Sequence, residues 1–472
     1  MEKDKKLGLF SLTALVITSS IGAGIFNISG DLASGAAAGP AIIAWIIVGF
    51  GILMLSLSFK NLLLKKPELN GIFSYAEDGF GQFGGFISGW GYWLSAWLGN
   101  VAFATMLMST LSYFFPVFGN GQNVASIIGA SIIMWVLTYI VNRGVEEAAL
   151  INTVVTIFKL IPIFLFIVIG IVAFKVDLFT NHFWGNISTN FNLSDIFSQV
   201  KSCMMVMMWV FVGIEGASML SSRANKKSEA GRATILGLIG LFTIYVLASM
   251  IPYGVMSKVE LSKLATPSMA YILKDIVGPW GAAFINVGLI ISISGAWLSW
   301  TMLPSETTLL MARSKLLPKI FGKVNGAGAP TFSLIITAVL TQLFIFTFLF
   351  TDKAYQFAYS LCTAAILVCY LFVGLYQFKI SYLNRHEKGE IKQIIIGLIT
   401  VIFETWAIVV SGLNYTLLCL IAYIPGIVFF AMARKENGEK KLLSKTQSIL
   451  TTLIVIGAIY VIYQLAIGKI TI

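Results

Sequence analysis

Long apolar runs repeat along the whole of this sequence and are separated by short charged connections. Hydrophobic residues make up 57% of the 472 residues, and charged residues only 11%, against roughly 25% in typical soluble domains. One water-soluble core cannot hide this much apolar surface, because a folded chain needs polar cover. The composition argues against a soluble enzyme and against a nucleic-acid binder, although the net charge is +11. It indicates an integral membrane protein.

The apolar runs are long enough to cross a bilayer as helices, which need roughly 20 residues each. Helices are expected because a chain in lipid must satisfy its own backbone hydrogen bonds, and the alternating segments of a β-barrel are absent from the sequence. We predict an all-α integral membrane fold of twelve spans with a thirteenth at the C-terminus. The spans lie near residues 9–31, 40–64, 83–115, 123–141, 149–174, 197–220, 232–255, 280–311, 330–350, 355–378, 393–412, 415–433 and 448–468.

Positive charge is distributed unevenly between the two sets of alternate connections. Most of the 32 lysines and arginines fall on the side that carries the N-terminus, which places that side in the cytoplasm. The asymmetry explains the basic composition without a polyanionic partner. No low-complexity linker divides the chain, so we expect one membrane domain over residues 1–433. Helices 1–10 (about 9–378) form its core, helices 11–12 occupy about 393–433, and 434–472 holds a cytoplasmic linker and the thirteenth helix.

Two spans are interrupted by small residues near their middle. The first contains Ser19-Ser20-Ile21-Gly22-Ala23-Gly24, and the sixth contains Val212-Gly213-Ile214-Glu215-Gly216. An offset of five helices makes two inverted halves, and paired interruptions of this kind mark the substrate site of secondary transporters. Unwound amides in the first span suit a carboxylate, and freed carbonyls in the sixth suit an ammonium group. Close helix packing is the alternative role for the glycines.

Charged side chains inside the spans are the next outliers, because burying them in a bilayer is costly. Lys159 lies ten residues into the fifth span. It either replaces a coupling sodium ion or braces helices 1 and 5 as a static charge. Glu215 either marks the transport pathway or makes a structural hydrogen bond. Glu306 and Glu404 could balance Lys159 or face a substrate cation, and Pro304 is expected to break the eighth span beside Glu306.

Cysteine and histidine give no reactive cluster in the sequence. The four cysteines all lie inside apolar runs without a CxxC pair, and His182 and His386 lie in polar connections. We therefore interpret the cysteines as small packing residues. We expect no enzyme activity, no cofactor and no metal site.

These motifs together resemble the amino acid–polyamine–organocation transporters, and within them the basic amino acid/polyamine antiporter family, where the arginine/ornithine type is the most similar. The resemblance covers essentially the whole chain through span 12. It rests on these stretches: Gly22-Ala23-Gly24-Ile25-Phe26, Phe86 to Trp97, Trp97-Leu98-Gly99-Asn100, Trp209 to Ser218, and Gly295-Ala296-Trp297.

The resemblance implies two inverted five-helix repeats with broken helices 1 and 6. It implies that the amides of Gly22, Ala23 and Gly24 hold the α-carboxylate of the substrate. Carbonyls around Trp209 and Val212 would take the α-ammonium group.

The resemblance also assigns the side-chain end of the substrate. Trp297 would stack on it, and Ala96, Asn100 and Ser360 would line its far end. Ser20 and Trp97 complete the predicted substrate-binding set. The gating or coupling candidates are Phe73, Trp93, Lys159, Glu215 and Glu306.

Two departures leave the substrate pair and the coupling open. Ala23 stands where arginine/agmatine antiporters have serine, and Lys159 resembles the helix-5 lysine of proton-coupled relatives. We expect exchange of external arginine for internal ornithine by alternating access in a bacterial plasma membrane. The alternatives are histidine/histamine or lysine/cadaverine exchange, or proton-coupled symport. A channel would show repeated pore motifs.

The expected partners are small-molecule amino acids and amines and the lipid bilayer, with no nucleic acid. The resemblance also implies a possible homodimer.

Overall fold

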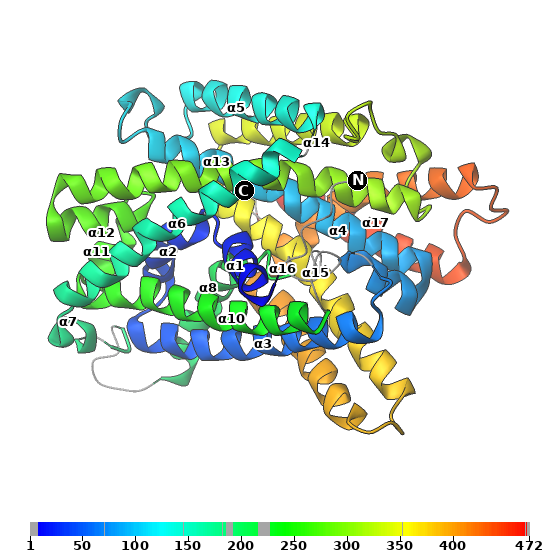
Figure 1. Ribbon diagram of the computed structural model, residues 1–472, viewed down its shortest axis with the longest axis horizontal. Coiled ribbons are helices and arrows are strands. Elements are labelled where there is room, and N and C mark those ends of the chain that lie inside the picture. The colour runs from blue at the N-terminus through cyan, green and yellow to red at the C-terminus, as the bar shows by residue number, and fades with distance from the viewer. Residues whose placement is uncertain are drawn as a thin grey trace. The chain divides into compact units, whose positions relative to one another are not determined.

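The computed structural model describes residues 8–69, 71–144, 146–181, 183–185, 192–215, 227–351, 353–467 and 469. Every regular element within these residues is a helix (Figure 1). These ranges contain ten helical segments that are long and apolar enough to cross a membrane, and two of the ten lie in one helix over Glu390–Glu436. The all-α, multi-pass membrane fold expected from the sequence is confirmed.

The helices follow one another with short connections. The α-helices are α1 (Leu9–Ser20), α2 (Ile28–Gly35), α3 (Ala38–Lys65), α4 (Ile72–Leu111), α5 (Val124–Arg143), α6 (Glu146–Ala173), α7 (Val176–Thr180), α8 (Leu193–Val210), α10 (Lys227–Met250), α11 (Lys258–Ser262), α12 (Ser268–Val277), α13 (Pro279–Arg313), α14 (Thr331–Ile345), α15 (Ala354–Leu383), α16 (Glu390–Glu436) and α17 (Lys445–Ala466). The 3₁₀ helices are η1 (Gly24–Phe26), η2 (Pro116–Phe118), η4 (Ile251–Gly254), η5 (Lys319–Gly322) and η6 (Phe346–Leu349).

The helices divide into two compact units, and the first comprises residues 1–60, 102–130 and 149–297. In this unit α3 runs beside α10 (Figure 1). The indole of Trp45 on α3 donates to the Ser249 hydroxyl at 3.0 Å. A Cβ at Gly49 would lie 2.3 Å from the ring of Phe242, so glycine permits this close approach. Helix α1 packs against α10, and α2 packs against α8 and α11.

The second unit comprises residues 61–101, 131–148 and 298–472. Its centre is the antiparallel pair α15 and α16, which glycine brings into contact. A Cβ at Gly397 on α16 would lie 2.6 Å from the backbone nitrogen of Phe378 on α15. The indole of Trp90 on α4 donates to the Ala422 carbonyl on α16 at 2.9 Å. These contacts tie α4, α15 and α16 into one bundle.

The expected interruption of the first span is confirmed. Helix α1 ends at Ser20, Ile21 is extended with φ −75° and ψ 96°, and the chain resumes as η1 and α2. The sixth span also stops early, because α8 ends at Val210 and Gly213 has a positive φ of 106°. The remainder of that span, residues 216–220, lies outside the described residues.

The third and last predicted spans also have helical counterparts. Helix α4 begins at Ile72, before the predicted start at 83, and Gly81 interrupts its regular geometry with a φ of 78°. Helix α17 is long and apolar enough to be a thirteenth span. All four cysteines are buried and none forms a disulfide with a described residue, as the packing role predicts.

Candidate functional site

The break between α1 and α2 is held by two side chains that take the carbonyls at the end of α1. Tyr245 on α10 donates its hydroxyl to the Ser20 carbonyl at 2.9 Å. Lys159 on α6 donates its Nζ to the Ile21 carbonyl at 3.1 Å. Both side chains are buried. These carbonyls lack helical partners because α1 stops, so the two hydrogen bonds stabilise the unwound backbone.

The same break leaves a row of donors without protein acceptors. The backbone amides of Gly22, Ala23 and Gly24 donate to no acceptor among the described residues. The Ser20 hydroxyl is buried and, within the same part of the chain, also has no partner. Buried polar groups are nearly always hydrogen-bonded, so this cluster points to a ligand. Three amides and a hydroxyl suit a carboxylate.

Gly24 faces the end of α8 at very close range. A Cβ there would lie 2.8 Å from Trp209 Nε1 and 2.9 Å from Val210 Cγ1. On the other side of the break, a Cβ at Gly22 would lie 3.1 Å from the ring of Phe103. The Trp209 and Phe103 rings are themselves 6.3 Å apart. The structure therefore places Gly24 against Trp209 and Gly22 against Phe103, and the role of these residues in substrate binding stays a prediction.

The turn that follows α8 is closed by its own glutamate. The amide of Gly213 donates to Glu215 Oε2 at 3.1 Å, and both groups are buried. The Trp209 carbonyl accepts the amide of Val212 at 3.1 Å. Binding of an ammonium group at this carbonyl stays a prediction. The structural hydrogen bond considered for Glu215 is observed, and its gating role stays a prediction.

Trp297, at the end of the first unit, is completely buried on α13. The predicted stacking on a substrate requires an exposed ring face, which this conformation does not offer. Val212, Trp209 and Ala23 are also almost inaccessible. The structure thus shows these predicted substrate residues shielded from solvent.

In the second unit, Pro304 and Asn100 are linked through one carbonyl. The expected break of the eighth span at Pro304 is wrong, because α13 continues from Pro279 to Arg313. Proline removes the hydrogen bond to the carbonyl four residues earlier, which is that of Trp300. Asn100 Nδ2 donates to this carbonyl at 3.0 Å. The lost helical bond is thereby replaced by a side chain from α4, and the helix stays continuous.

Asn100 keeps one unused acceptor. Its Oδ1 is buried and, among the described residues, receives no hydrogen bond. On α13, the Thr308 hydroxyl donates to the backbone carbonyls of Pro304 and Ser305, at 3.1 and 3.0 Å. The Asn100 side chain is fixed by its bond to the Trp300 carbonyl, so its buried amide oxygen suits a cationic hydrogen-bond donor.

The other predicted residues of α4 face α15 and α14. Ser95 Oγ lies 3.2 Å from Cys362 Sγ on α15, which sets Ala96 and Trp97 on a helix packed against the one that carries Ser360. Trp97 Nε1 is buried and has no acceptor within the described residues. By contrast, Trp93 Nε1 donates to Thr337 Oγ1 at 3.0 Å. Trp93 therefore has a packing partner, and its gating role stays a prediction.

The remaining gating candidates lie near the ends of their helices. Phe73 is buried in the first turn of α4. Glu306 is partly buried, two residues after Pro304. The gating roles of both residues stay predictions.

Sequence reasoning missed Tyr245, Trp300 and Phe103. A tyrosine in the middle of an apolar span needs an acceptor for its hydroxyl, so Tyr245 could have been singled out. Trp300 contributes a backbone carbonyl, and Phe103 contributes a ring. The type of residue at positions 300 and 103 does not predict either of these roles.

Comparison with known proteins identifies the family of this chain. The family model described as amino acid permease matches residues 7–468. The chain belongs to the amino acid permease family. This permease is 62% identical over 468 residues to an arginine/ornithine antiporter from Latilactobacillus sakei, covering 99% of this chain and 98% of the relative. It is 40% identical to an arginine/ornithine antiporter from Pseudomonas aeruginosa, covering 100% and 99%. It is 38% identical to an arginine/agmatine antiporter from Chlamydia caviae, covering 99% and 98%.

Proposed function

We propose that this permease is a secondary-active antiporter that exchanges arginine for ornithine by alternating access. We place it in a bacterial plasma membrane with its N-terminus in the cytoplasm. The names of the two full-length relatives at 62% and 40% identity support the substrate pair. The distribution of lysine and arginine supports the orientation. A homodimer stays a prediction from the family resemblance.

The observation that carries the proposal is the cluster of donors at the break of the first span. The amides of Gly22, Ala23 and Gly24 have no acceptor among the described residues, and the buried hydroxyl of the nearby Ser20 has no partner among them either. An α-carboxylate supplies the acceptors that they lack. The aromatic ring of Trp209, next to Gly24, suits the flat or cationic side chain of a basic amino acid.

Exchange of this pair needs no external energy source. Arginine and ornithine both carry one positive charge on the side chain at neutral pH. One-for-one exchange therefore moves no net charge, and the gradient of either amino acid drives the other. Each ligand acts by shifting the same equilibrium between inward-facing and outward-facing states.

A counterflow assay in proteoliposomes tests the proposal. Vesicles are loaded with ornithine, and entry of labelled arginine is followed. We expect ornithine-loaded vesicles to take up arginine much faster than empty ones. Vesicles loaded with agmatine, histamine or cadaverine serve as the comparison. If internal ornithine does not accelerate arginine entry, the assignment of this substrate pair is wrong.

Gly24→Ala tests the site separately from the substrate pair. The added methyl would lie 2.8 Å from Trp209 Nε1 and displace the amides, so we expect a large loss of arginine binding. Gly326→Ala is the matched control, because no atom lies within 4 Å of a Cβ at Gly326. Equal arginine binding by both variants would remove Gly24 from the site.

Proton-coupled uptake is the second candidate, and the contact of Lys159 with the break favours it. A lysine ammonium at the Ile21 carbonyl lies where loss of a proton would change the unwound backbone directly. Uptake measured over a series of external pH values separates the two mechanisms. Exchange should be independent of a proton gradient, whereas symport should follow it.

A further inference from the structure

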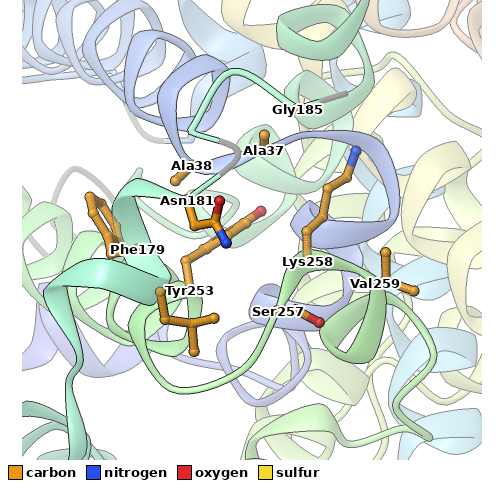
Figure 2. Close-up of a pocket in the computed structure, with 10 residues that line it drawn as sticks. Ala37, Ala38, Phe179, Asn181, Gly185, Tyr253, Ser257, Lys258 and Val259 are labelled. Carbon is orange, nitrogen blue, oxygen red and sulfur yellow. The ribbon is translucent and has the colours of Figure 1, made fainter. Parts of the chain in front are cut away.

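A cavity of about 190 Å³ lies in the first unit, away from the break of the first span. Figure 2 shows Asn181 pointing into it between Phe179 and Lys258. Ala38, at the start of α3, and the buried Tyr253 form further parts of its wall. Two spans end here, α6 at Ala173 and α10 with η4 at Gly254. The cavity therefore lies at the height where the membrane core meets the headgroups.

The walls of the cavity are held by hydrogen bonds. The Tyr253 hydroxyl donates to the Ala36 carbonyl at 2.9 Å, and the Lys175 amide donates to the Gly254 carbonyl at 2.8 Å. At the edge, Ser257 donates its amide and hydroxyl to Glu260 Oε2 at 2.8 and 2.6 Å. These hydrogen bonds fix the shape of the cavity.

The charge of the cavity is positive. Lys258 makes no ion pair or hydrogen bond with any described residue, and the described residues that line the cavity include no carboxylate. The nearest acid in sequence, Glu260, is occupied by Ser257, whose hydrogen bonds hold the pKa of that carboxyl below its ordinary value. The ammonium of Lys258 and the amide of Asn181 therefore suit an anion. A cationic amino acid would be repelled.

Helix α6, which ends five residues before the cavity-lining Leu178, carries an exposed apolar stripe. Ile161, Phe164, Val168 and Ile171 recur at helical spacing and are 48%, 51%, 59% and 55% exposed. Val176, which follows the end of α6, is 65% exposed. Exposed apolar side chains in this register suit hydrocarbon chains.

We propose that the cavity is a binding site for an anionic glycerophospholipid. Its phosphate group binds between Lys258 and Asn181, and an acyl chain lies along the apolar stripe of α6. A lipid headgroup and a soluble phosphate ester share the phosphate ester group that would bind here. The stripe selects the lipid over a soluble phosphate ester, because only the lipid covers both surfaces. The proposal depends on the membrane fold and is independent of the substrate pair.

Thermal unfolding of the purified full chain in detergent tests the site. Phosphatidylglycerol, phosphatidylcholine and soluble sn-glycerol 1-phosphate are titrated separately. We expect phosphatidylglycerol alone to raise the Tm. Lys258→Gln should weaken its binding about fivefold, as loss of one lysine near an anionic headgroup implies. Ala38→Leu should also weaken binding by narrowing the cavity while keeping the charge.

Lys263→Gln is the matched control, because Lys263 is exposed at the end of α11 and does not line the cavity. It should bind phosphatidylglycerol as the unmodified protein does. Equal stabilisation by phosphatidylglycerol and phosphatidylcholine overturns the proposal. Equal weakening by Lys258→Gln and Lys263→Gln also overturns it, since only surface charge would then matter. Full stabilisation by sn-glycerol 1-phosphate overturns the assignment to a lipid.

Discussion

At the scale of single residues, a proline on α13 and an asparagine on α4 act on the same backbone carbonyl. Pro304 frees the Trp300 carbonyl, and Asn100 occupies it from α4. The bond leaves Asn100 Nδ2 engaged and its Oδ1 available. A proline inside a membrane helix thus positions a polar group on a neighbouring helix without ending its own.

Pro304→Ala should separate stability from substrate binding. The alanine amide would compete with Asn100 for the Trp300 carbonyl, and the helix would lose a residue that costs ~3 kcal/mol in helix interiors. We expect the Tm to stay level or rise, while apparent arginine affinity falls about fivefold, the equivalent of one hydrogen bond. Asn100→Ala, and the double variant, complete a double-mutant cycle. Additive effects on affinity would show that Asn100 does not depend on the proline.

Lys159 donates to a backbone carbonyl at the break of the first span. Lys159→Met keeps the length of the side chain and leaves the Ile21 carbonyl without its donor. We expect the free energy of unfolding to fall by about 1–3 kcal/mol, the usual cost of an unsatisfied buried polar group. Exchange should be lost while arginine binding persists, because Lys159 contacts the carbonyl side of the break and not its amides. Full exchange activity in Lys159→Met would remove this lysine from the mechanism.

At the scale of elements, polar and aromatic contacts of Tyr75, Asp78 and Tyr376 join the first turns of α4 to the last turns of α15, and we call these contacts the latch. Lys66 Nζ lies 3.4 Å from Asp78 Oδ2, and the Tyr376 hydroxyl donates to the same carboxylate. The rings of Tyr75 and Tyr376 stack with centroids 6.0 Å apart. Lys379 donates to the Gly79 carbonyl. Both helix ends carry predicted site residues further along, so their separation would move those residues.

Tyr376→Phe should weaken this latch while keeping the ring stack. We expect a loss of about 1 kcal/mol in the free energy of unfolding. In a cycle with Asp78→Asn, a coupling energy of about 0.5–3 kcal/mol is expected for residues in contact. Tyr382→Phe is the control, because Tyr382 stacks on Phe378 near the same helix end and is 51% exposed. Zero coupling between Asp78 and Tyr376 would show that their hydrogen bond does not hold α4 to α15.

At the scale of the whole molecule, the last helix contributes little to the packed interior. Only Ala458 and Val461 of α17 are buried. The segment before it is better anchored. Arg434 donates to Gln82 Oε1 on α4 at 2.7 Å, and Glu436 Oε2 accepts the Lys319 amide at 2.8 Å. Helix α16 runs on to Glu436, three residues past the end predicted for the membrane domain.

Truncation after Gly438 should therefore leave an active permease. It removes α17 and keeps both anchors, so we expect exchange close to that of the full chain. The loss of stability should be a few kcal/mol at most, since burying one valine contributes about 1.5–3 kcal/mol. Truncation after Phe430 removes Arg434 and Glu436 as well and should lower the yield of folded protein sharply. Loss of exchange on truncation after Gly438 would show that α17 takes a direct part in transport. Size-exclusion and counterflow measurements distinguish these results.

The sequence alone determined the helical membrane architecture and the place where the first span opens. Both follow from local chemistry, because apolar runs in lipid must satisfy their own backbone and a Gly-Ala-Gly stretch tolerates unwinding. Only the tertiary structure decided which groups meet there. Lys159 reaches Ile21 across 138 positions, Tyr245 reaches Ser20 across 225, and Asn100 reaches Trp300 across 200. Such pairs depend on how helices pack, so α13 continues through Pro304, where residue type alone predicted a break.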